Sequence, residues 1–242
     1  FITEEKEQPY KLLILVHSTP EDPNKTGVII DKEAKKIGGV EVHQFEVNMG
    51  YPTINEKGNI VLHNYIYEKD VMGEIVKEDH DKKGFEIIPD KTVCMIRGSS
   101  EKVYRFAETV RLQDVFMINS RFTHLVCDDK WLNYVTMKRD GLKQPRTSLV
   151  KSERTLDVGL KEIGSKFPLI LKTARGTQGI GVIFVESEKN LIATIQLINK
   201  FDEHEGILIQ EFIKTEYDAR VMVFNNEVVA ALKRPVLKGD FR

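Results

Sequence analysis

The sequence predicts a mixed protein in two successive parts, an α/β half followed by an α+β half. Three observations support this prediction. Apolar runs of strand length alternate with helical patterns over residues 1–119. Short alternating runs, typical of antiparallel strands, interrupt this order at about residues 51–91. Beyond residue 120, strand patterns flank a loop rich in glycine, within the stretch PLILKTARGTQGIGVIF of residues 168–184.

The composition is that of a globular protein with enough chain for one or two hydrophobic cores. Of the 242 residues, 41% are hydrophobic and 30% are charged, and the formal net charge is −1. This balance gives no reason to expect nucleic-acid binding, and no apolar run approaches the roughly 18–20 residues that cross a membrane. We expect a cytoplasmic protein with reduced thiols at Cys94 and Cys127, and the scattered histidines predict no metal site.

The first half has the strand and helix order of a Rossmann-like layer. Strands are expected at residues 10–17, 40–47, 92–97 and 115–118, and helices at 28–37 and from about 101 to 110. The first strand, YKLLILVH, contains the continuous apolar run LLILV, which is typical of a strand buried on both faces. In the first helix, Ile30, Ala34 and Ile37 recur at helical spacing, and Gly38 supplies a stop. We therefore expect a Rossmann-like domain over residues 1–119.

The second half combines helices with antiparallel strands. Strands are expected at residues 169–172, 182–185, 207–213, 219–224 and 227–233, and helices at 128–140, 156–163 and from Ser187 onward. Asp128 is the expected N-cap of the first of these helices, and Gly141 is its expected stop. The dipeptide Asn225-Asn226 predicts a two-residue hairpin turn. We therefore expect a separate domain over residues 120–242.

The glycine loop fits neither of two familiar phosphate-binding motifs. Its first and last glycines have P-loop spacing, but Val182-Ile183 stands where the motif needs lysine and a hydroxyl residue. The Gly-Ile-Gly of residues 179–181 lacks the third glycine of the dinucleotide fingerprint, because Phe184 occupies that position and a strand follows. The remaining interpretation is a strand–loop–strand flap whose backbone N–H groups face phosphate oxygens, with an ordinary hairpin turn as the alternative.

Polar residues in apolar surroundings favour the binding interpretation. Lys172 lies in an otherwise apolar strand, where burial is costly without an anionic partner. Lys130 lies in the first turn of a predicted helix, where a cation opposes the helix dipole. Gln210 and Glu211 interrupt the apolar run LIQEFI. Each feature alone has an ordinary structural explanation, such as an exposed strand end or a surface charge, but together these explanations require several coincidences.

From residue 119 onward the sequence resembles the ATP-grasp superfamily, and within it the RimK-type glutamate ligases. The matching stretches, in family order, are Asn119, CDDK (127–130), QPRTSLV (144–150), FPLILKTARGTQGIGVIFVES (167–187), LIQEFIK (208–214), DARVMVFNNEVVAALKR (218–234) and KGDFR (238–242). The resemblance implies an ATP-grasp domain preceded by a Rossmann-like pre-ATP-grasp domain. The first half fits this family more loosely, and the insertion at 51–91 departs from the family core.

The resemblance also implies roles for individual residues. Lys130 and Lys172 would contact the nucleotide phosphates, and Asp218 would lie on the nucleotide side. The flap over the phosphates would contain Gly176, Thr177, Gln178, Gly179, Ile180, Gly181 and Val182. The hinge strand would contain Gln210, Glu211, Phe212 and Ile213, whose backbone reads the adenine edge while Glu211 adds a polar contact. The candidates for catalytic contacts are Arg220, Arg234 and Arg242, the first two gripping carboxylates and the last reaching the phosphates.

One of these arginines has a pattern of its own. Arg220 alternates with Met222 and Phe224 along its strand, so the three share a face, and we interpret Arg220 as an inward-pointing cation.

The implied activity is an ATP-dependent, ADP-forming ligation through an acyl phosphate. It would join an amino acid such as glutamate to a peptide or protein carboxylate. The family's magnesium ligands follow GDFR, beyond residue 242, so no metal ligand is assigned here, and we expect this chain to be a fragment whose ATP-grasp domain is incomplete at its C-terminal end. The alternative is an ATP-binding module without ligase activity, either inactive or truncated. A dinucleotide-dependent oxidoreductase is disfavoured because residues 10–50 lack G-x-G-x-x-G, and homo-oligomerisation stays open.

Overall fold

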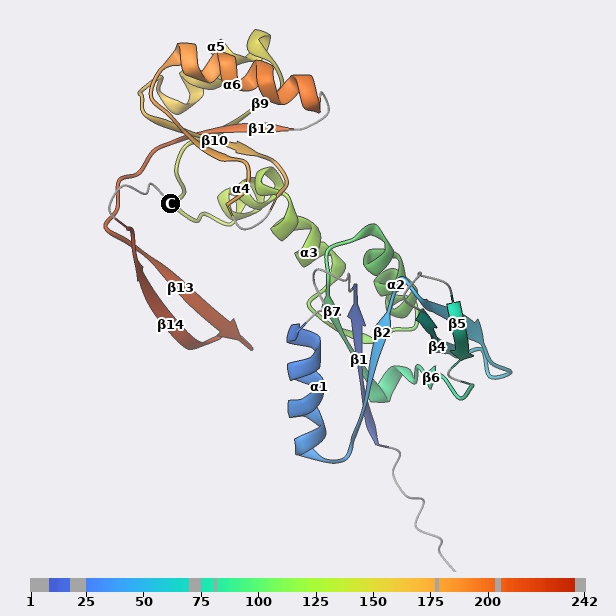
Figure 1. The fold of residues 1–242 in the computed structure, drawn as a ribbon. Helices are drawn as coiled ribbons and strands as arrows, with labels where there is room; N and C mark the ends of the chain where they lie inside the picture. The colour runs from blue at the N-terminus through green and yellow to red at the C-terminus, as the bar shows by residue number, and fades with distance from the viewer. Residues whose placement is uncertain are drawn as a thin grey trace, which may run out of the picture. The chain divides into compact units, whose positions relative to one another are not determined.

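The computed structural model describes residues 9–17, 25–69, 75–80, 82–176, 179–202 and 206–237. Backbone contacts divide the chain into two compact units, Phe1–His124 and Leu125–Arg242. Each unit has its own sheet and its own hydrophobic core (Figure 1). The division falls within helix α3 (Arg121–Asp128), a few residues after the boundary expected from the sequence.

The first unit contains a four-stranded parallel sheet in the order β2-β1-β7-β8. Its strands are β1 (Tyr10–Val16), β2 (Val40–Glu46), β7 (Thr92–Arg97) and β8 (Phe116–Ile118), with helices α1 (Lys25–Ile37) and α2 (Glu101–Arg111). Leu13, Ile14 and Leu15 are completely buried in the central strand, as its unbroken apolar run predicts. Ser100 is the N-cap of helix α2, and its hydroxyl accepts a hydrogen bond from the Val103 N–H.

The predicted buried face of α1 is only partly correct. Ala34 is buried, but Ile37 in the last turn is 80% exposed. Gly38 follows with a φ of 75°, in the left-handed region that glycine adopts without steric cost. The helix therefore ends where the sequence predicts, while its final turn extends beyond the hydrophobic core.

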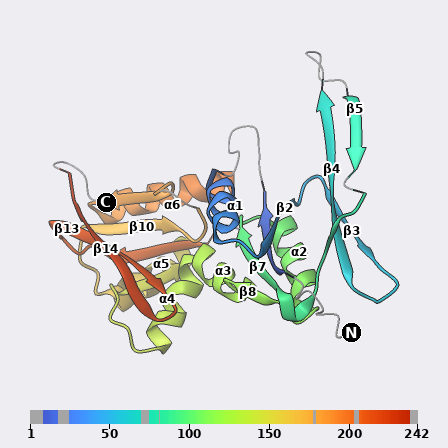
Figure 2. The same cartoon turned by 90° about the horizontal axis from the view of Figure 1, so that it is seen from below.

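Between β2 and β7, four antiparallel strands and a short 3-10 helix form an insertion. They are β3 (Gly50–Ile54), β4 (Ile60–Lys69), β5 (Ile75–His80), β6 (Phe85–Glu86) and η1 (Pro89–Lys91). Strand β4 pairs with β3 and β6 over its first half and with β5 over its second half, and Figure 2 shows β4 and β5 side by side. Leu62 and Phe85 pack in the same core as Leu13 of β1, so the insertion is part of this unit's hydrophobic interior.

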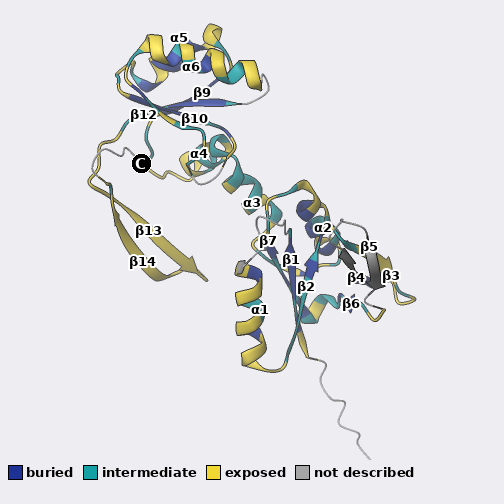
Figure 3. Ribbon diagram, viewed as in Figure 1, coloured by how far each residue is buried: buried dark blue, intermediate teal, exposed yellow. Residues whose placement is uncertain are grey.

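The second unit is organised around a four-stranded antiparallel sheet in the order β11-β10-β12-β9. Its strands are β9 (Thr147–Val150), β10 (Leu169–Thr173), β11 (Val182–Val185) and β12 (Ile207–Glu211), with helices α5 (Glu153–Ile163) and α6 (Glu188–Phe201). Both helices cover the same face of the sheet, with buried inner sides and exposed outer sides (Figures 1 and 3). Leu160 of α5 and Leu191 of α6 pack with Leu171 and Ile209 of the sheet to form the core.

The segment before this sheet contains two helices, where the sequence predicted one. Helix α3 ends at Asp128, and α4 (Lys130–Arg139) begins directly after Asp129. The predicted cap at Asp128 is therefore wrong. Asp129 is the N-cap because its backbone is extended and its carboxylate accepts from the Trp131 and Leu132 N–H groups. Gly141 follows the helix with a φ of 76°, as expected for its stop.

The last described elements are β13 (Tyr217–Phe224) and β14 (Glu227–Pro235), which form a two-stranded hairpin. Asn225 and Asn226 both have positive φ, 49° and 64°, which confirms the predicted two-residue turn. Every residue of both strands is exposed (Figure 3). The interpretation of Arg220 as an inward-pointing cation is therefore wrong among the described residues, because no described element covers its face of the hairpin.

Candidate functional site

The two faces of the second sheet carry different side chains. Leu171 and Ile209 face the helices and are completely buried. Their neighbours Lys172 and Gln210 lie on the opposite face, because successive side chains of a strand alternate between faces. Lys172 and Gln210, two of the residues expected to bind a nucleotide, thus lie on the side that α5 and α6 leave open.

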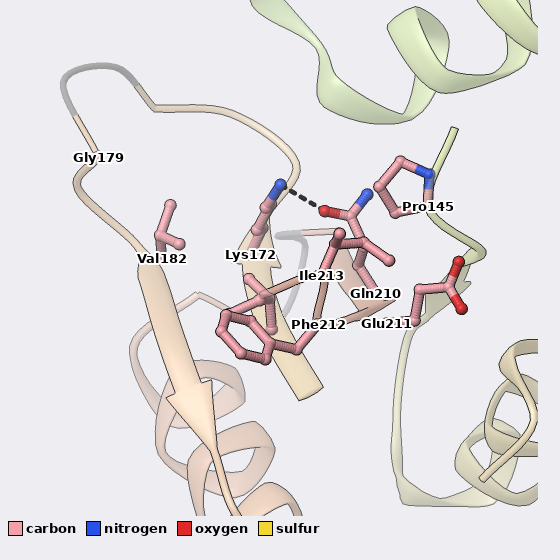
Figure 4. Close-up of a pocket in the computed structure, with 9 residues that line it drawn as sticks. Pro145, Lys172, Gly179, Val182, Gln210, Glu211, Phe212 and Ile213 are labelled. Atoms are coloured by element: carbon pink, nitrogen blue, oxygen red, sulfur yellow. Dashed lines mark hydrogen bonds between the residues drawn. The ribbon is translucent and has the colours of Figure 1, made fainter. Parts of the chain in front are cut away.

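Two cavities occupy this open face. The first, which we call the apolar cavity, has a volume of about 370 Å³ and is lined by Pro145, Ile170, Lys172, Gly179, Val182, Gln210, Glu211, Phe212 and Ile213 (Figure 4). The second, the polar cavity, has a volume of about 420 Å³ and is lined by Cys127, Lys130, Asn133, Tyr134, Gln144, Pro145, Thr147, Lys172, Leu208 and Gln210. Lys172 and Gln210 belong to both linings, so the two cavities adjoin along these side chains.

Lys130 and Lys172 come from different elements and line the same polar cavity. The Lys130 backbone N–H donates to the Ala174 carbonyl at 2.9 Å, which ties the start of α4 to the end of β10. Its ammonium donates to the Gly176 carbonyl at 3.0 Å, at the base of the glycine loop. Burial lowers the pKa of Lys172, and the positive charge of Lys130 lowers it further. An anion bound between these two side chains would relieve both effects.

The Lys172 ammonium has a neutral partner in this structure. It donates a hydrogen bond to the Gln210 side-chain oxygen at 2.7 Å (Figure 4). Phe212 lies beside this pair and packs edge-to-face on Phe184, with ring centroids 5.0 Å apart. The apolar cavity therefore combines an aromatic and aliphatic lining with one ammonium group at its border, which suits a flat heterocycle joined to phosphates.

The glycine loop connects β10 to β11 above the apolar cavity. Gly176, Gly179 and Gly181 have φ values of 109°, 79° and 74°, which confirms that these positions need the left-handed region. The loop base closes through a hydrogen bond of 3.0 Å from the Thr173 N–H to the Gly181 carbonyl. Ile180 is 72% exposed. Thr177 and Gln178, two other predicted flap residues, lie outside the described residues.

The predicted hinge segment is only partly a strand. Strand β12 ends at Glu211, so Phe212 and Ile213 leave the sheet and line the apolar cavity instead. The Glu211 carboxylate points away from Lys172 (Figure 4) and is held by Arg146, whose backbone N–H and guanidinium donate at 2.7 and 2.8 Å. These hydrogen bonds lower the pKa of Glu211. In this arrangement the Glu211 carboxylate binds Arg146, and its polar contact with adenine stays a prediction.

The remaining predicted residues do not line either cavity among the described residues. Arg234 grips Asp218 with two hydrogen bonds of 2.7 and 2.6 Å on the exposed hairpin. This pairing lowers the pKa of Asp218 and raises that of Arg234. Arg220 is exposed on the same hairpin. Arg242 lies outside the described residues, so its predicted phosphate contact stays a prediction.

Residues that sequence reasoning missed complete the site. Arg146 holds Glu211, Thr147 lines the polar cavity, and Ile170 supplies an apolar wall together with Val182 of the predicted flap. The stretch QPRTSLV indicated the segment from which Arg146 and Thr147 come, but it assigned neither residue a role. Their partners lie more than 60 positions away in the chain, so no local pattern could have identified these contacts.

Two kinds of feature are absent from the part of the chain that the structure describes. No group of three or more His, Cys, Asp or Glu side chains there is placed to hold a metal ion. Within the same residues, every helix is too short or too polar to pass through a bilayer.

Comparison with known proteins shows what the second half of the chain is similar to. A family model of the RimK-like ATP-grasp domain matches residues 127–242. A probable alpha-L-glutamate ligase from Legionella pneumophila (strain Corby) is 34% identical over 161 residues, which are 65% of this chain and 51% of that protein. The chain spans about half the length of the curated relatives it matches.

Solved structures show that the fold is the mixed α/β ATP-grasp fold. A RimK domain ATP-grasp protein from Sphaerobacter thermophilus DSM 20745 is similar over 93% of this chain and 72% of its own, with a TM-score of 0.59 and 15% identity. The ATP-grasp ligase PsnB, solved with the precursor peptide PsnA2 and AMPPNP, covers the same shares with a TM-score of 0.58 and 15% identity. Residues 127–242 are thus similar to the RimK-like ATP-grasp family model, and the fold is that of ATP-grasp proteins.

Proposed function

We propose that this chain binds ATP and belongs to an ADP-forming carboxylate–amine ligase. The observation that carries the proposal is the convergence of Lys130 and Lys172 on the polar cavity, with the Lys130 ammonium also bonded to the Gly176 carbonyl at the base of the glycine loop. Two ammonium groups that share a cavity repel each other, and a bound polyphosphate would neutralise both. The adjoining apolar cavity would receive the adenine base, with Phe212 and Ile213 along its edge.

The proposed reaction asks the protein to position reactants and neutralise charge. A substrate carboxylate oxygen attacks the γ-phosphorus of ATP, the bond from that phosphorus to the bridging oxygen breaks, and ADP leaves. The acyl phosphate then reacts with an amine, which forms an amide and releases phosphate and a proton. Lysines, backbone N–H groups and arginines supply the positioning and charge that such transfers require. The hairpin arginines Arg220 and Arg234 are proposed to grip carboxylates, and Asp218 and Arg242 to lie on the nucleotide side.

The proposed substrates rest on the relatives. The name of the Legionella protein supports glutamate or a similar amino acid as the amine. The peptide in the PsnB structure supports a peptide or protein carboxylate as the acceptor. Magnesium is proposed as a partner of ATP whose ligands lie outside the described residues. We also propose that the whole protein is cytoplasmic.

An ATP-binding module without ligase activity is the second candidate. It is supported by the two lysines and the adjoining cavities, which would bind a nucleotide whether or not a ligation follows. The two candidates share the nucleotide site and differ in their products. The ligase would release ADP when amine and carboxylate are both present, whereas the binding module would release none.

Nucleotide binding is tested by calorimetric titration of ATP into the wild type and two lysine variants. Lys172→Ala should abolish measurable ATP binding, because it removes the ammonium at the junction of the two cavities. Lys161→Ala is the matched control: it removes the same charge from an exposed position on α5, which covers the other face of the sheet. Unchanged affinity in Lys172→Ala would contradict the proposed site.

Ligase activity is tested by mass spectrometry with the complete gene product. Candidate peptides are incubated with ATP, Mg²⁺ and mixed amino acids, and the products are searched for the mass of an added residue. A peptide extended by one amino acid, with matching ADP release, supports the ligase. ATP binding without any extended product supports the binding module.

A further inference from the structure

Lys172 is the first member of a chain of four hydrogen-bonded groups that crosses the open face of the sheet. Its ammonium donates to the Gln210 Oε1 at 2.7 Å. The Gln210 Nε2 donates to the Thr147 Oγ1 at 2.7 Å, and this hydroxyl donates to the Pro145 carbonyl at 2.9 Å. Thr147 is only 7% exposed. The first three groups come from β10, β12 and β9, and the Pro145 carbonyl comes from the segment directly before β9. These hydrogen bonds therefore link three strands.

The direction of every hydrogen bond in this chain follows from its last member. The Pro145 carbonyl can only accept a hydrogen bond, so the Thr147 hydroxyl must donate its single proton to that carbonyl. The Thr147 oxygen is then left as an acceptor and must receive the amide N–H of Gln210. The Gln210 amide consequently presents its oxygen to Lys172, which is the only orientation that an ammonium group tolerates, because an ammonium has no lone pair to accept with.

We propose that Thr147 is a positioning residue for nucleotide binding, acting on Lys172 through the side chain of Gln210. The hydroxyl fixes the Gln210 amide, and the amide fixes the lysine ammonium at the border of the two cavities. This inference rests on the proposed function, since it assigns Lys172 to a nucleotide phosphate. It adds a residue to which neither the motifs nor the cavities alone give a role.

A held lysine matters because its four-carbon stem is flexible. A free lysine side chain must lose its rotational freedom when it binds phosphate, and this loss weakens binding. The relay of hydrogen bonds from Thr147 to Lys172 removes part of that loss in advance. It also protects the site against the opposite amide orientation, in which the Gln210 N–H groups would face the ammonium.

The test compares hydroxyl-free and hydroxyl-bearing variants by calorimetric titration of ATP into the whole protein. Thr147→Val keeps the side-chain shape without the hydroxyl, and Thr147→Ala provides a second, smaller variant in case valine disturbs folding. Both should bind ATP about 3- to 10-fold more weakly, the range expected when one long side chain must be immobilised on binding. Thr147→Ser keeps the hydroxyl and should restore wild-type affinity.

The adjacent residue provides a matched control. Ser148 is also buried, 4% exposed, but its hydroxyl donates to Glu162 on the helix-covered side of the sheet. Ser148→Ala therefore removes a buried hydroxyl without touching the relay, and its ATP affinity should equal that of the wild type. Weakened binding in Ser148→Ala to the same degree as in Thr147→Val would overturn the proposal, because loss of any buried hydroxyl would then explain the result.

A double-mutant cycle separates positioning from direct contact with the nucleotide. Gln210→Leu breaks the relay in its middle, so Thr147→Val should cause no further loss of affinity in that background. Additive losses would overturn the proposal, and so would wild-type affinity in both hydroxyl-free variants. A wild-type protein that binds no ATP would instead refute the proposed function, and the inference with it.

Discussion

Replacing Gly181 with alanine should strain the base of the glycine loop in two separate ways. Gly181 has a φ of 74°, where an alanine is disfavoured by its Cβ. The new Cβ would also collide with the Thr173 Oγ1 and would lie 3.2 Å from the Thr173 Cγ2. Thr173 cannot move away freely, because its hydroxyl donates to the Arg175 carbonyl at 2.6 Å.

The magnitude follows from these two contributions. A left-handed backbone at a non-glycine residue costs about 1–2 kcal/mol. Displacing the Thr173 hydroxyl from its acceptor costs about 1 kcal/mol more, the usual net value of one hydrogen bond. Gly141→Ala is the matched control, since Gly141 has a similar φ of 76° and an added Cβ there would have no neighbouring atom within 4 Å. The free energy of unfolding should therefore fall by about 2–3 kcal/mol in Gly181→Ala and by about 1–2 kcal/mol in Gly141→Ala.

Urea unfolding followed by fluorescence measures this difference directly. Trp131 is the chain's single tryptophan, and it lies half-buried in α4 of the second unit, so its emission reports that unit. ATP affinity should fall in Gly181→Ala alone, because only that change displaces the loop that borders the apolar cavity. Equal unfolding free energies and equal ATP affinities in the two variants would refute the reasoning, because the contact between the loop and Thr173 would then carry no energy.

Two other outcomes follow from the same geometry. Burial raises the pKa of the Cys94 thiol to about 12, so Cys94 should not react with iodoacetamide near neutral pH while the protein is folded. The reagent should label exposed Cys127 in the folded protein, and it should label both thiols only in urea. ATP should slow the labelling of Cys127, because this residue lines the polar cavity. The pKa of Glu211 in the folded protein lies below its ordinary value of 4.5. The contribution of ionised Glu211 to folding stability is therefore complete above pH 4.5, and it is lost as the pH falls through the lower pKa of the folded state. Acid titration of stability should show this loss in the wild type and not in Arg146→Leu, and identical acid profiles would contradict the Arg146–Glu211 contact.

Features that depend on neighbouring residues could be predicted from the sequence. The turn at Asn225-Asn226 and the positive φ of Gly176 and Gly181 follow from what individual residues permit. The shared cavity of Lys130 and Lys172 was expected from the family resemblance, which orders motifs along the chain. In each case the evidence was either local or came from a known arrangement of motifs.

Features that depend on distant partners could not be predicted. Glu211 reads as a polar residue in an apolar run, but its role is decided by Arg146, 65 positions earlier. The run LIQEFI also predicted a strand through Ile213, because hydrophobicity indicates burial without distinguishing a sheet from a cavity wall. The choice of Asp129 over Asp128 as helix cap is a similar case, since both are good caps and only the backbone conformation decides.

The hairpin shows the same limit for the candidate carboxylate-binding residues. Alternation along β13 indicates which residues share a face with Arg220, but it does not indicate what covers that face. Arg234 is paired with Asp218, and both side chains are about half exposed, so water competes for the pair and it contributes little to stability. If Arg234 grips a substrate carboxylate as proposed, that carboxylate would replace Asp218 at little cost, since it would offer the guanidinium two oxygens in the same plane. The observed pair is thus compatible with the proposed grip on a substrate, and it already presents Arg234 in the geometry that such a grip requires.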